Sequence, residues 1–399
     1  MTYDGFLIPL HGRRAAASAL VVLGLLTSAC ANSTPSVHPT YTLGHFPAVP
    51  TGSFSHSTAG ALQSVLDAAV KRGLPGITAT VLAADGQAWS GAAGTADGTH
   101  PLEVRSQFGI ASITKTVIAA EIMRLSEKGL LRLNDPVSKH LPSNFHFDTN
   151  GATVENLLHM QSGIPDPAAN NAELAAFYGQ TPDPLHVWTP QEVLASVPAN
   201  RSKPGDHYVY EDANYMLLGL VIEETTGKSV AAALRSDVLA DPRVSSMVYQ
   251  PEERPQGPLA LPFGAPLASN SGGYLPNKAE ASEGNGSGCM ASDSGALALW
   301  GYLLFGGHLV SEQSLLAMTD FGDGFYGLGV LDQTKNGAWV GAGQAIGNGG
   351  WDPGGYSSAL VVLPIRGIVI AILTNESGDP KTLAFPVAVA IASALKNAR

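Results

Sequence analysis

Hydrophobic positions near the two ends of the chain follow the pattern of β-hairpins. Apolar stretches at residues 77–82 and 87–92 are joined around an Asp-Gly pair, which suits a tight hairpin turn. Two further apolar stretches, at residues 359–363 and 368–373, are separated by a turn that contains proline and glycine. The pattern predicts one hairpin early in the chain and another near its end.

Helical periodicity fills most of the chain between these hairpins. From Thr114 to about Val238 apolar residues recur at helical spacing, interrupted by loops with proline and glycine. Two helices are predicted outside this segment, one from a cap at Ser57 to Gly73 and one over residues 382–397. Because strands lie at both ends, the sequence predicts an α+β fold, in which an antiparallel sheet built from both termini is flanked by helices and an inserted lobe is mainly helical.

Residues 250–288 show neither the helical nor the strand periodicity of apolar residues, and they are rich in proline, glycine, serine and asparagine. We interpret them as a long loop region that borders the functional site. The expected boundaries are then a sheet lobe at about 56–111 and 289–399, and a helical lobe with loops at about 112–288.

The first thirty residues have the features of an export signal. Two arginines at 13 and 14 precede an apolar run at residues 15–26, and small residues precede Cys30. The run is too short to span a bilayer of about 30 Å as a helix. Residues 1–29 are therefore predicted to be a signal peptide, exported by the general secretory or the twin-arginine route.

A cysteine directly after small residues is typical of a bacterial lipoprotein processing site. We expect Cys30 to carry a diacylglycerol group, with plain cleavage or an uncleaved anchor as the alternatives. Residues 31–55 are rich in proline, serine, threonine and glycine, which indicates a flexible tether on the outer face of the cell membrane. Cys289 then has no disulfide partner, and we expect it to be buried and inert.

Composition excludes several classes of function. Hydrophobic residues make up 45% and charged residues 14% of the 399, which suits one large globular domain over residues 56–399. The formal net charge of −11 repels phosphate backbones and argues against a nucleic-acid partner. The histidines are scattered without a zinc-binding pattern, and no phosphate-cradling glycine loop or G-x-S-x-G elbow is present. We therefore expect neither a metal nor a cofactor.

One short motif carries candidate chemistry. Ser112-Ile113-Thr114-Lys115 opens an apolar run that predicts a buried helix. Residues three apart lie on one helix face about 5 Å apart, so the Ser112 hydroxyl and the Lys115 amine are expected to meet. Burial favours a neutral lysine, which would activate the serine, and free N–H groups at the helix start would stabilise an oxyanion. Alone the motif is weak, because a helix cap followed by a surface lysine has the same pattern.

Further segments around this motif occur in a recognisable order, namely residues 108–116, 125–137, 157–165, 204–219, 326–329 and 353–358. Their order and spacing resemble the superfamily of serine β-lactamases, D,D-peptidases and esterases, particularly the branch that contains class C β-lactamases. The similarity runs from about residue 57 to the end of the chain. It implies a β-lactamase/transpeptidase-like fold and a hydrolase that acts through an acyl-Ser112 intermediate.

The resemblance also implies a role for Tyr210. This residue would be the second base, which relays the proton between Ser112, the leaving group and water. In the resembling family the stretch that contains His159 and Ser162 is structural. We therefore expect no catalytic role for His159.

Two positions depart from the family's pattern. Asp212 stands where the family has asparagine, and a carboxylate near Lys115 favours the ammonium, which makes Lys115 a poorer base and shifts that duty toward Tyr210. Asn348 stands where the family has lysine or histidine, and it lacks the charge that helps to bind a substrate carboxylate. Neutral esters or amides are therefore expected substrates in preference to penicillins or peptides that end in D-Ala.

The substrate-binding residues implied by the resemblance are Asp212, Asn348, Gly349, Gly350 and Trp351. The N–H of Trp351 would pair with that of Ser112 as an oxyanion hole. Two functions stay open: a serine hydrolase of an ester, amide or cell-wall peptide, and a catalytically degenerate lipoprotein that binds cell-wall fragments or a partner. In either case the partners are a small-molecule or peptide ligand and, through Cys30, the membrane.

Overall fold

The computed structural model describes residues 42–167, 183–199, 201–263, 272–322, 324–334, 338–339, 343–378 and 383–397. The predicted signal peptide, the predicted lipidation site Cys30 and the first part of the predicted tether lie outside these ranges. Within them, each helix is either too short or too polar to span a membrane.

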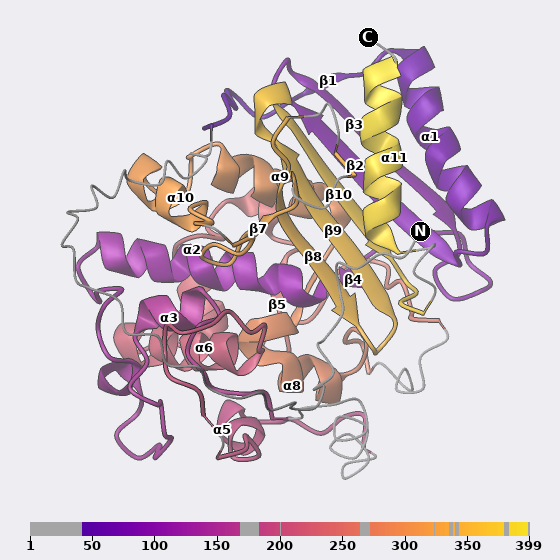
Figure 1. The fold of residues 1–399 in the computed structure, drawn as a ribbon. Coiled ribbons are helices and arrows are strands. Elements are labelled where there is room, and N and C mark those ends of the chain that lie inside the picture. Colours follow the sequence, from indigo (N-terminus) through magenta and orange to yellow (C-terminus); the bar gives the residue numbers. More distant parts are fainter. Residues whose placement is uncertain are drawn as a thin grey trace, which may run out of the picture.

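A mainly antiparallel sheet in the order β1-β3-β2-β10-β9-β8-β7 forms the centre of one lobe (Figure 1). Its strands are β1 (Gly52–Ser53), β2 (Gly76–Ala83), β3 (Gln87–Gly94), β7 (Leu331–Asp332), β8 (Ile346–Asp352), β9 (Tyr356–Leu363) and β10 (Ile368–Thr374). β2 and β3 form the first predicted hairpin, and β9 and β10 form the second. Because β2 pairs with β10, the two hairpins join into one sheet, which confirms the prediction of a sheet built from both termini.

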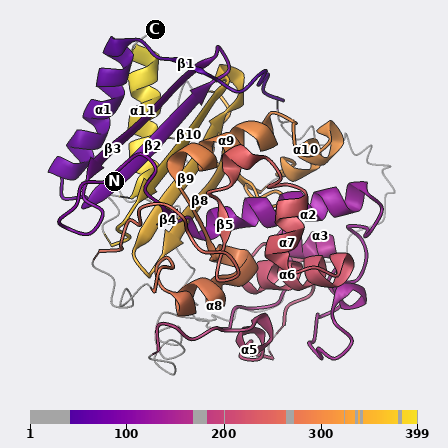
Figure 2. The same ribbon diagram turned by 180° about the vertical axis from the view of Figure 1, so that it is seen from behind.

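Helices cover both faces of this sheet (Figures 1 and 2). α1 (His56–Lys71) and α11 (Ala384–Asn397) pack side by side on one face, and α9 (Ser294–Phe305) packs on the other. In β10, Ile370 belongs to the core under α1 and α11, whereas Val369 belongs to the core under α9. Both faces are therefore buried, which explains why these strands are apolar throughout.

The start of α1 corrects two predictions. The N-cap is Ser55, whose side chain accepts a hydrogen bond from the Thr58 N–H at 3.1 Å, and the predicted cap Ser57 lies inside the helix. Just upstream, Phe46 is buried against Tyr302 and β1 pairs with β3. The last residues of the predicted flexible tether therefore pack on the sheet lobe, because apolar side chains in that stretch reach the core.

The second lobe is mainly helical, as predicted. Its elements are η1 (Ala111–Ile113), α2 (Thr114–Glu127), η2 (Val137–His140), α3 (Val154–Leu158), α5 (Pro190–Leu194), α6 (Ala213–Thr226), α7 (Val230–Ser236), η3 (Pro242–Val244) and α8 (Lys278–Gly288). Helix α10 (Glu312–Met318) follows later in the chain, within the range predicted as sheet lobe. A small sheet of β4 (Phe108–Gly109), β5 (Val248–Tyr249) and β6 (Met290–Ser292) joins this lobe to the rest, and η5 (Pro364–Arg366) turns the second hairpin. α2 packs against both α6 and α8.

Helix α8 overturns the prediction that residues 250–288 form only loop, although residues 264–271 lie outside the described ranges. The helix begins after Asn277, whose side chain accepts from the Glu280 N–H at 2.9 Å. Its sequence has little apolar periodicity, and it is held by close packing on α6 instead. A Cβ atom at Gly286 would lie 2.4 Å from the Tyr215 carbonyl oxygen, so glycine permits this approach.

A buried carboxyl in α2 predicts a pH dependence of stability. Burial, and next the charge of Asp237, raise the pKa of Glu121 from 4.5 to about 7. The folded protein therefore binds this proton more tightly than the unfolded chain. Protonation of Glu121 makes its full contribution to the free energy of unfolding below about pH 4.5, and this contribution is lost as the pH rises through 7.

The free energy of unfolding of the wild type is therefore expected to fall by up to about 3 kcal/mol between pH 5 and pH 8.5 on account of Glu121. In Glu121→Gln this fall should be absent. Urea unfolding of both proteins at the two pH values measures the difference. Glu312→Gln, an exposed carboxyl in α10, is the control for net charge. An identical pH dependence in the wild type and in Glu121→Gln would contradict the prediction.

Candidate active site

The candidate nucleophile lies at the junction of the two lobes. Ser112 is in η1, which continues directly into α2 and contacts both β8 and α8. The preceding Ala111 has a positive φ of 47°, which is uncommon for a residue with a side chain. Such conformations cluster at functional sites, where the surrounding structure holds them in place.

The amine of Lys115 binds three oxygen atoms. Its side chain is fully buried in the first turn of α2, and Nζ donates to Ser112 Oγ at 3.1 Å, to the Ser287 carbonyl oxygen at 2.8 Å and to Asp212 Oδ1 at 2.5 Å. The structure therefore brings together Ser112 and Lys115, as the motif indicated. All three N–H bonds of the ammonium have an acceptor.

Asp212 sets the charge of this lysine. Burial alone favours the neutral amine, but the negative charge and hydrogen bond of Asp212, together with Tyr210, outweigh it, and the net effect raises the pKa of Lys115 above its usual value. Lys115 is an ammonium at neutral pH. This agrees with the consequence expected for a carboxylate at the family's asparagine position.

Tyr210 comes from the segment just before α6, and its ring centroid lies 4.9 Å from Lys115 Nζ. The residue is 37% exposed, and its ring packs perpendicular to the ring of Tyr326, with the two centroids 5.9 Å apart. Burial of the hydroxyl raises the pKa of Tyr210, against the lowering effects of Lys115 and of hydrogen bonding to Lys115 and Ser112. The phenol is therefore protonated at neutral pH, with its hydroxyl toward the other two groups.

Asp166 is a site residue that sequence reasoning missed. Its Oδ1 accepts from the Ala213 N–H at 3.0 Å, at the start of α6, and its own N–H donates to Glu211 Oε2 at 2.9 Å. Burial, and then the charges of Asp212 and Glu211, raise the pKa of Asp166 well above its usual value. Asp166 thus fixes the segment that carries Tyr210 and Asp212. No sequence pattern links it to that segment, because the contact is made by tertiary folding.

The third motif, Asn348-Gly349-Gly350, lies on β8 beside η1. A Cβ atom at Gly350 would lie 2.3 Å from the Ile110 carbonyl oxygen, so glycine lets this strand approach the nucleophile turn. Asn348 is fully buried, with its amide donating to the Gly329 carbonyl oxygen at 3.1 Å and its Oδ1 accepting from the Gly349 N–H at 2.9 Å. The prediction that the Asn348 side chain contacts substrate is therefore wrong, because both ends of its amide form hydrogen bonds inside the protein.

Trp351 follows this motif and is half exposed, with its indole N–H donating to the Ser377 carbonyl oxygen at 2.8 Å. β7 pairs only with Ile346 and Gly347 of β8. In the described part of the chain the outer edge of β8 is thus free of a strand from Asn348 onward. Backbone groups there are available to a substrate, as the predicted oxyanion role of Trp351 requires.

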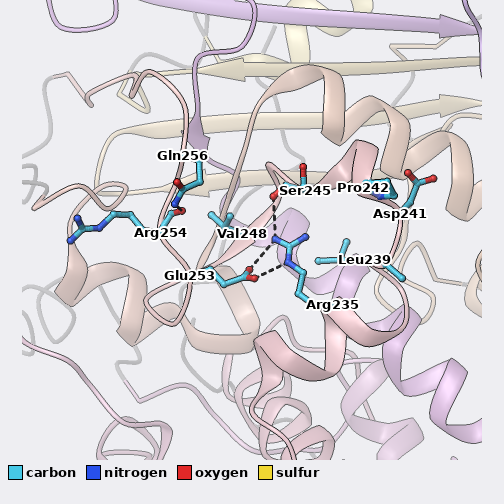
Figure 3. A pocket seen from close by; sticks show the side chains of 10 residues that line it. Arg235, Leu239, Asp241, Pro242, Ser245, Val248, Glu253, Arg254 and Gln256 are labelled. Atoms are coloured by element: carbon cyan, nitrogen blue, oxygen red, sulfur yellow. Dashed lines mark hydrogen bonds and ion pairs between the residues drawn. The ribbon is translucent and has the colours of Figure 1, made fainter.

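Neither of two surface depressions is lined by Ser112 or Lys115. One, of about 480 Å³, lies beside α7 and is lined by Arg235 and Glu253 among others (Figure 3). Arg235 Nε and Nη2 donate to the two Glu253 carboxylate oxygens at 2.7 and 3.0 Å, so this charge is already neutralised. The other, of about 410 Å³, is lined by His159 and aromatic side chains that include Tyr326. Neither contains a nucleophile with a base beside it.

The residues for which we expected no catalytic role lie wholly or partly inside the protein. Burial lowers the pKa of His159, so this ring is neutral, and Ser162 is buried with its hydroxyl accepting from the Ile164 N–H at 3.1 Å. Cys289 is buried, and burial raises the pKa of its thiol, as expected for an inert cysteine. Among the described residues, no three histidine, cysteine or acidic side chains are grouped so that they could bind a metal ion.

Known proteins are similar to this chain in sequence or in fold. The chain is 34% identical to Protein flp of Staphylococcus aureus over 128 residues, which cover 31% of this chain and 24% of the relative. It thus spans about a quarter of that relative's length. A D-stereospecific amidohydrolase from Streptomyces sp. superposes with a TM-score of 0.68 at 25% identity, covering 81% of this chain and 96% of that one.

A D-amino acid amidase from Ochrobactrum anthropi SV3 superposes with a TM-score of 0.71 at 23% identity, covering 86% of this chain and 99% of that one. These similarities confirm the predicted fold class. The family model named Beta-lactamase matches residues 62–392, which is most of the chain. The chain therefore belongs to the Beta-lactamase family.

Proposed function

We propose that this protein is a serine hydrolase that forms an acyl-Ser112 intermediate on an amide, peptide or ester. The convergence of the Ser112 hydroxyl, the Lys115 amine and the Tyr210 phenol, drawn from two distant segments, carries the proposal. Family membership and the similarity to an amidohydrolase support the same reaction class.

In the acylation step the Ser112 oxygen forms a bond to the substrate carbonyl carbon, and its proton passes to Lys115 or Tyr210. The tetrahedral oxyanion binds the N–H groups of Ser112 and Trp351. When the bond to the leaving group breaks, the group that accepted the proton returns it to the leaving group, through Tyr210 if Lys115 was the acceptor. Water then attacks the acyl carbon and gives one proton to the same base, and this proton returns to Ser112 Oγ as the acid is released. Both bases carry a proton at neutral pH, so the rate is expected to rise with pH.

A substrate screen tests the reaction class. Purified protein lacking residues 1–30 is assayed with short-chain nitrophenyl esters, a chromogenic cephalosporin, an amino acid nitroanilide and a peptide that ends in D-Ala-D-Ala. Turnover of an ester or an amide is expected to exceed that of the cephalosporin, because the position of the family's cation is the buried and uncharged Asn348.

The ion pair between Lys115 and Asp212 favours a second candidate, a cell-wall-fragment or partner-binding protein without turnover. A permanently charged lysine is a poor base. This candidate predicts no hydrolysis of any of these substrates at micromolar enzyme, together with saturable binding of a muropeptide. Turnover that follows enzyme concentration would exclude it.

We also propose that the chain is exported and held on the outer face of the cell membrane by lipidated Cys30. The apolar run and the small residues before this cysteine support the proposal. Cells grown with an alkyne fatty acid are expected to label the wild-type protein, and Cys30→Ser is expected to lose the label. Equal labelling and equal recovery in the membrane fraction would contradict this.

A further inference from the structure

One of the three acceptors of the Lys115 ammonium comes from a break in helix α8. Asn285 has non-helical backbone angles (φ 40°, ψ −136°) inside this helix, two residues before Ser287. The helix kinks there, so the residues after Asn285 form a separate last turn. Carbonyl groups in a last helical turn lack a donor from their own helix, and the Ser287 carbonyl oxygen accepts from Lys115 Nζ at 2.8 Å. The direction of this turn therefore decides whether the carbonyl reaches the ammonium.

The backbone of Asn285 is strained. Its angles lie outside the left-handed helical region that asparagine tolerates. Such conformations persist only where the surrounding structure holds them, and they cluster at functional sites. Ala111, directly before Ser112, also has a positive φ. Because regular helical angles would be more favourable for Asn285, specific contacts must keep the break in place.

The side chain of Asn285 supplies such contacts. Its Oδ1 accepts from the Tyr249 hydroxyl at 2.8 Å and from the Gly286 N–H at 2.7 Å. Burial raises the pKa of Tyr249 well above its usual value, so this phenol keeps its proton and donates it. The Asn285 carbonyl oxygen accepts from the Cys289 N–H at 3.1 Å. Hydrogen bonds to one residue thus fix the chain on the far side of the break.

Close packing holds this anchor in place. Tyr249 is only 3% exposed and lies in β5, which pairs with β6. A Cβ atom at Gly219 of α6 would lie 3.1 Å from Asn285 Oδ1, and one at Gly286 would lie 2.4 Å from the Tyr215 carbonyl oxygen. Glycine in both helices therefore lets the break lie directly against α6.

We propose that Asn285 and Tyr249 are positioning residues, which hold the break in α8 so that the Ser287 carbonyl binds the Lys115 ammonium. Without the Tyr249 hydroxyl, the strained turn is expected to relax and to carry this carbonyl away from Nζ. Lys115 then keeps only Ser112 and Asp212 as acceptors. The importance of this for a reaction rests on the proposed hydrolase function, whereas the geometry can be tested without any substrate.

Nuclear magnetic resonance of isotope-labelled lysine side chains tests the geometry. A buried ammonium with three acceptors exchanges its hydrogens with water slowly, so the wild type is expected to give a Lys115 signal that is absent in Lys115→Met. In Tyr249→Phe these hydrogens are expected to exchange about tenfold faster or more, because one hydrogen bond of a charged group is lost. Asn285→Gly, which removes the anchored side chain and accepts a positive φ, is expected to have the same effect.

Turnover measures the consequence for the reaction. Loss of one acceptor favours the neutral amine and by itself would raise its fraction by about tenfold. Misplacement of a catalytic group by about 1 Å lowers a rate by about 10²-fold, so kcat of Tyr249→Phe is expected to fall by about tenfold overall. KM should change by less than about twofold, because the substitution acts behind Lys115 and not on a substrate contact.

Tyr302→Phe is the matched control. It also removes one hydroxyl from a buried tyrosine, but that hydroxyl donates to the Ala48 carbonyl oxygen at 3.2 Å in the sheet lobe. Hydrogen exchange at Lys115 and kcat should both be unchanged in this variant. Urea unfolding of each variant confirms that it is folded, and Asn285→Gly serves if Tyr249→Phe is not.

The outcomes separate this inference from the function on which it rests. Exchange that is equally slow in the wild type and in the folded anchor variants overturns the positioning role, and so does a wild type without a slowly exchanging Lys115 signal. Faster exchange with an unchanged kcat overturns its importance for the reaction. If the wild type hydrolyses nothing, the hydrolase proposal fails, and the exchange measurement alone decides whether the anchor holds the ammonium.

Discussion

Replacing Ser112 with alanine is expected to lower the rate of ester or amide hydrolysis by about 10³-fold or more, because removal of a nucleophile leaves only binding and oxyanion stabilisation. The variant should keep its fold, since Lys115 Nζ, which donates to the serine hydroxyl, retains two other acceptors when that hydroxyl is removed. A fluorophosphonate probe, read out by gel fluorescence and by mass spectrometry of the labelled peptide, measures the loss directly.

Ser162→Ala is the matched control for this experiment. Ser162 follows a histidine by three residues in the sequence, but the structure buries its hydroxyl on the Ile164 N–H. Labelling is expected to persist in Ser162→Ala and to disappear in Ser112→Ala. Equal labelling of the two variants would show that Ser112 is not the nucleophile.

Asp212→Asn is expected to move the rising limb of the pH–rate profile to lower pH by about 1–3 units, since the loss of an adjacent opposite charge shifts a pKa by that amount. The sign follows from the site. Asp212 holds the pKa of Lys115 above its usual value, and burial without Asp212 favours the neutral amine. At neutral pH a larger fraction of the variant would carry an unprotonated lysine, and kcat/KM should rise about tenfold or more.

Profiles of kcat/KM from pH 6 to 10 for the wild type, Asp212→Asn and Asp206→Asn measure this effect. Asp206 is exposed and pairs at 3.7 Å with Lys203, so its replacement changes the net charge without touching Lys115. An unchanged profile in Asp212→Asn would show that Lys115 is not the base. A uniform loss of activity at every pH would show instead that the carboxylate itself is needed in the reaction.

The sequence by itself determined the elements whose patterns are local. The two hairpins, the terminal helix and the contact of Ser112 with Lys115 follow from residue spacing along one strand or one helix. The resemblance of ordered motifs then indicated Tyr210, and the substitution at Asp212 correctly indicated a charged lysine. Helix α8 was missed because its residues are polar and glycine-rich, so its helical state depends on packing against α6.

Only the tertiary structure decided which side chains meet across the lobes. It placed Asn348 in the interior and brought Asp166 to the start of α6. These outcomes depend on how strands and helices far apart in the chain are packed, and on which polar groups lose water when they do so. Burial and charge proximity set the protonation of the site, and neither quantity is encoded in the spacing of residues along a single segment.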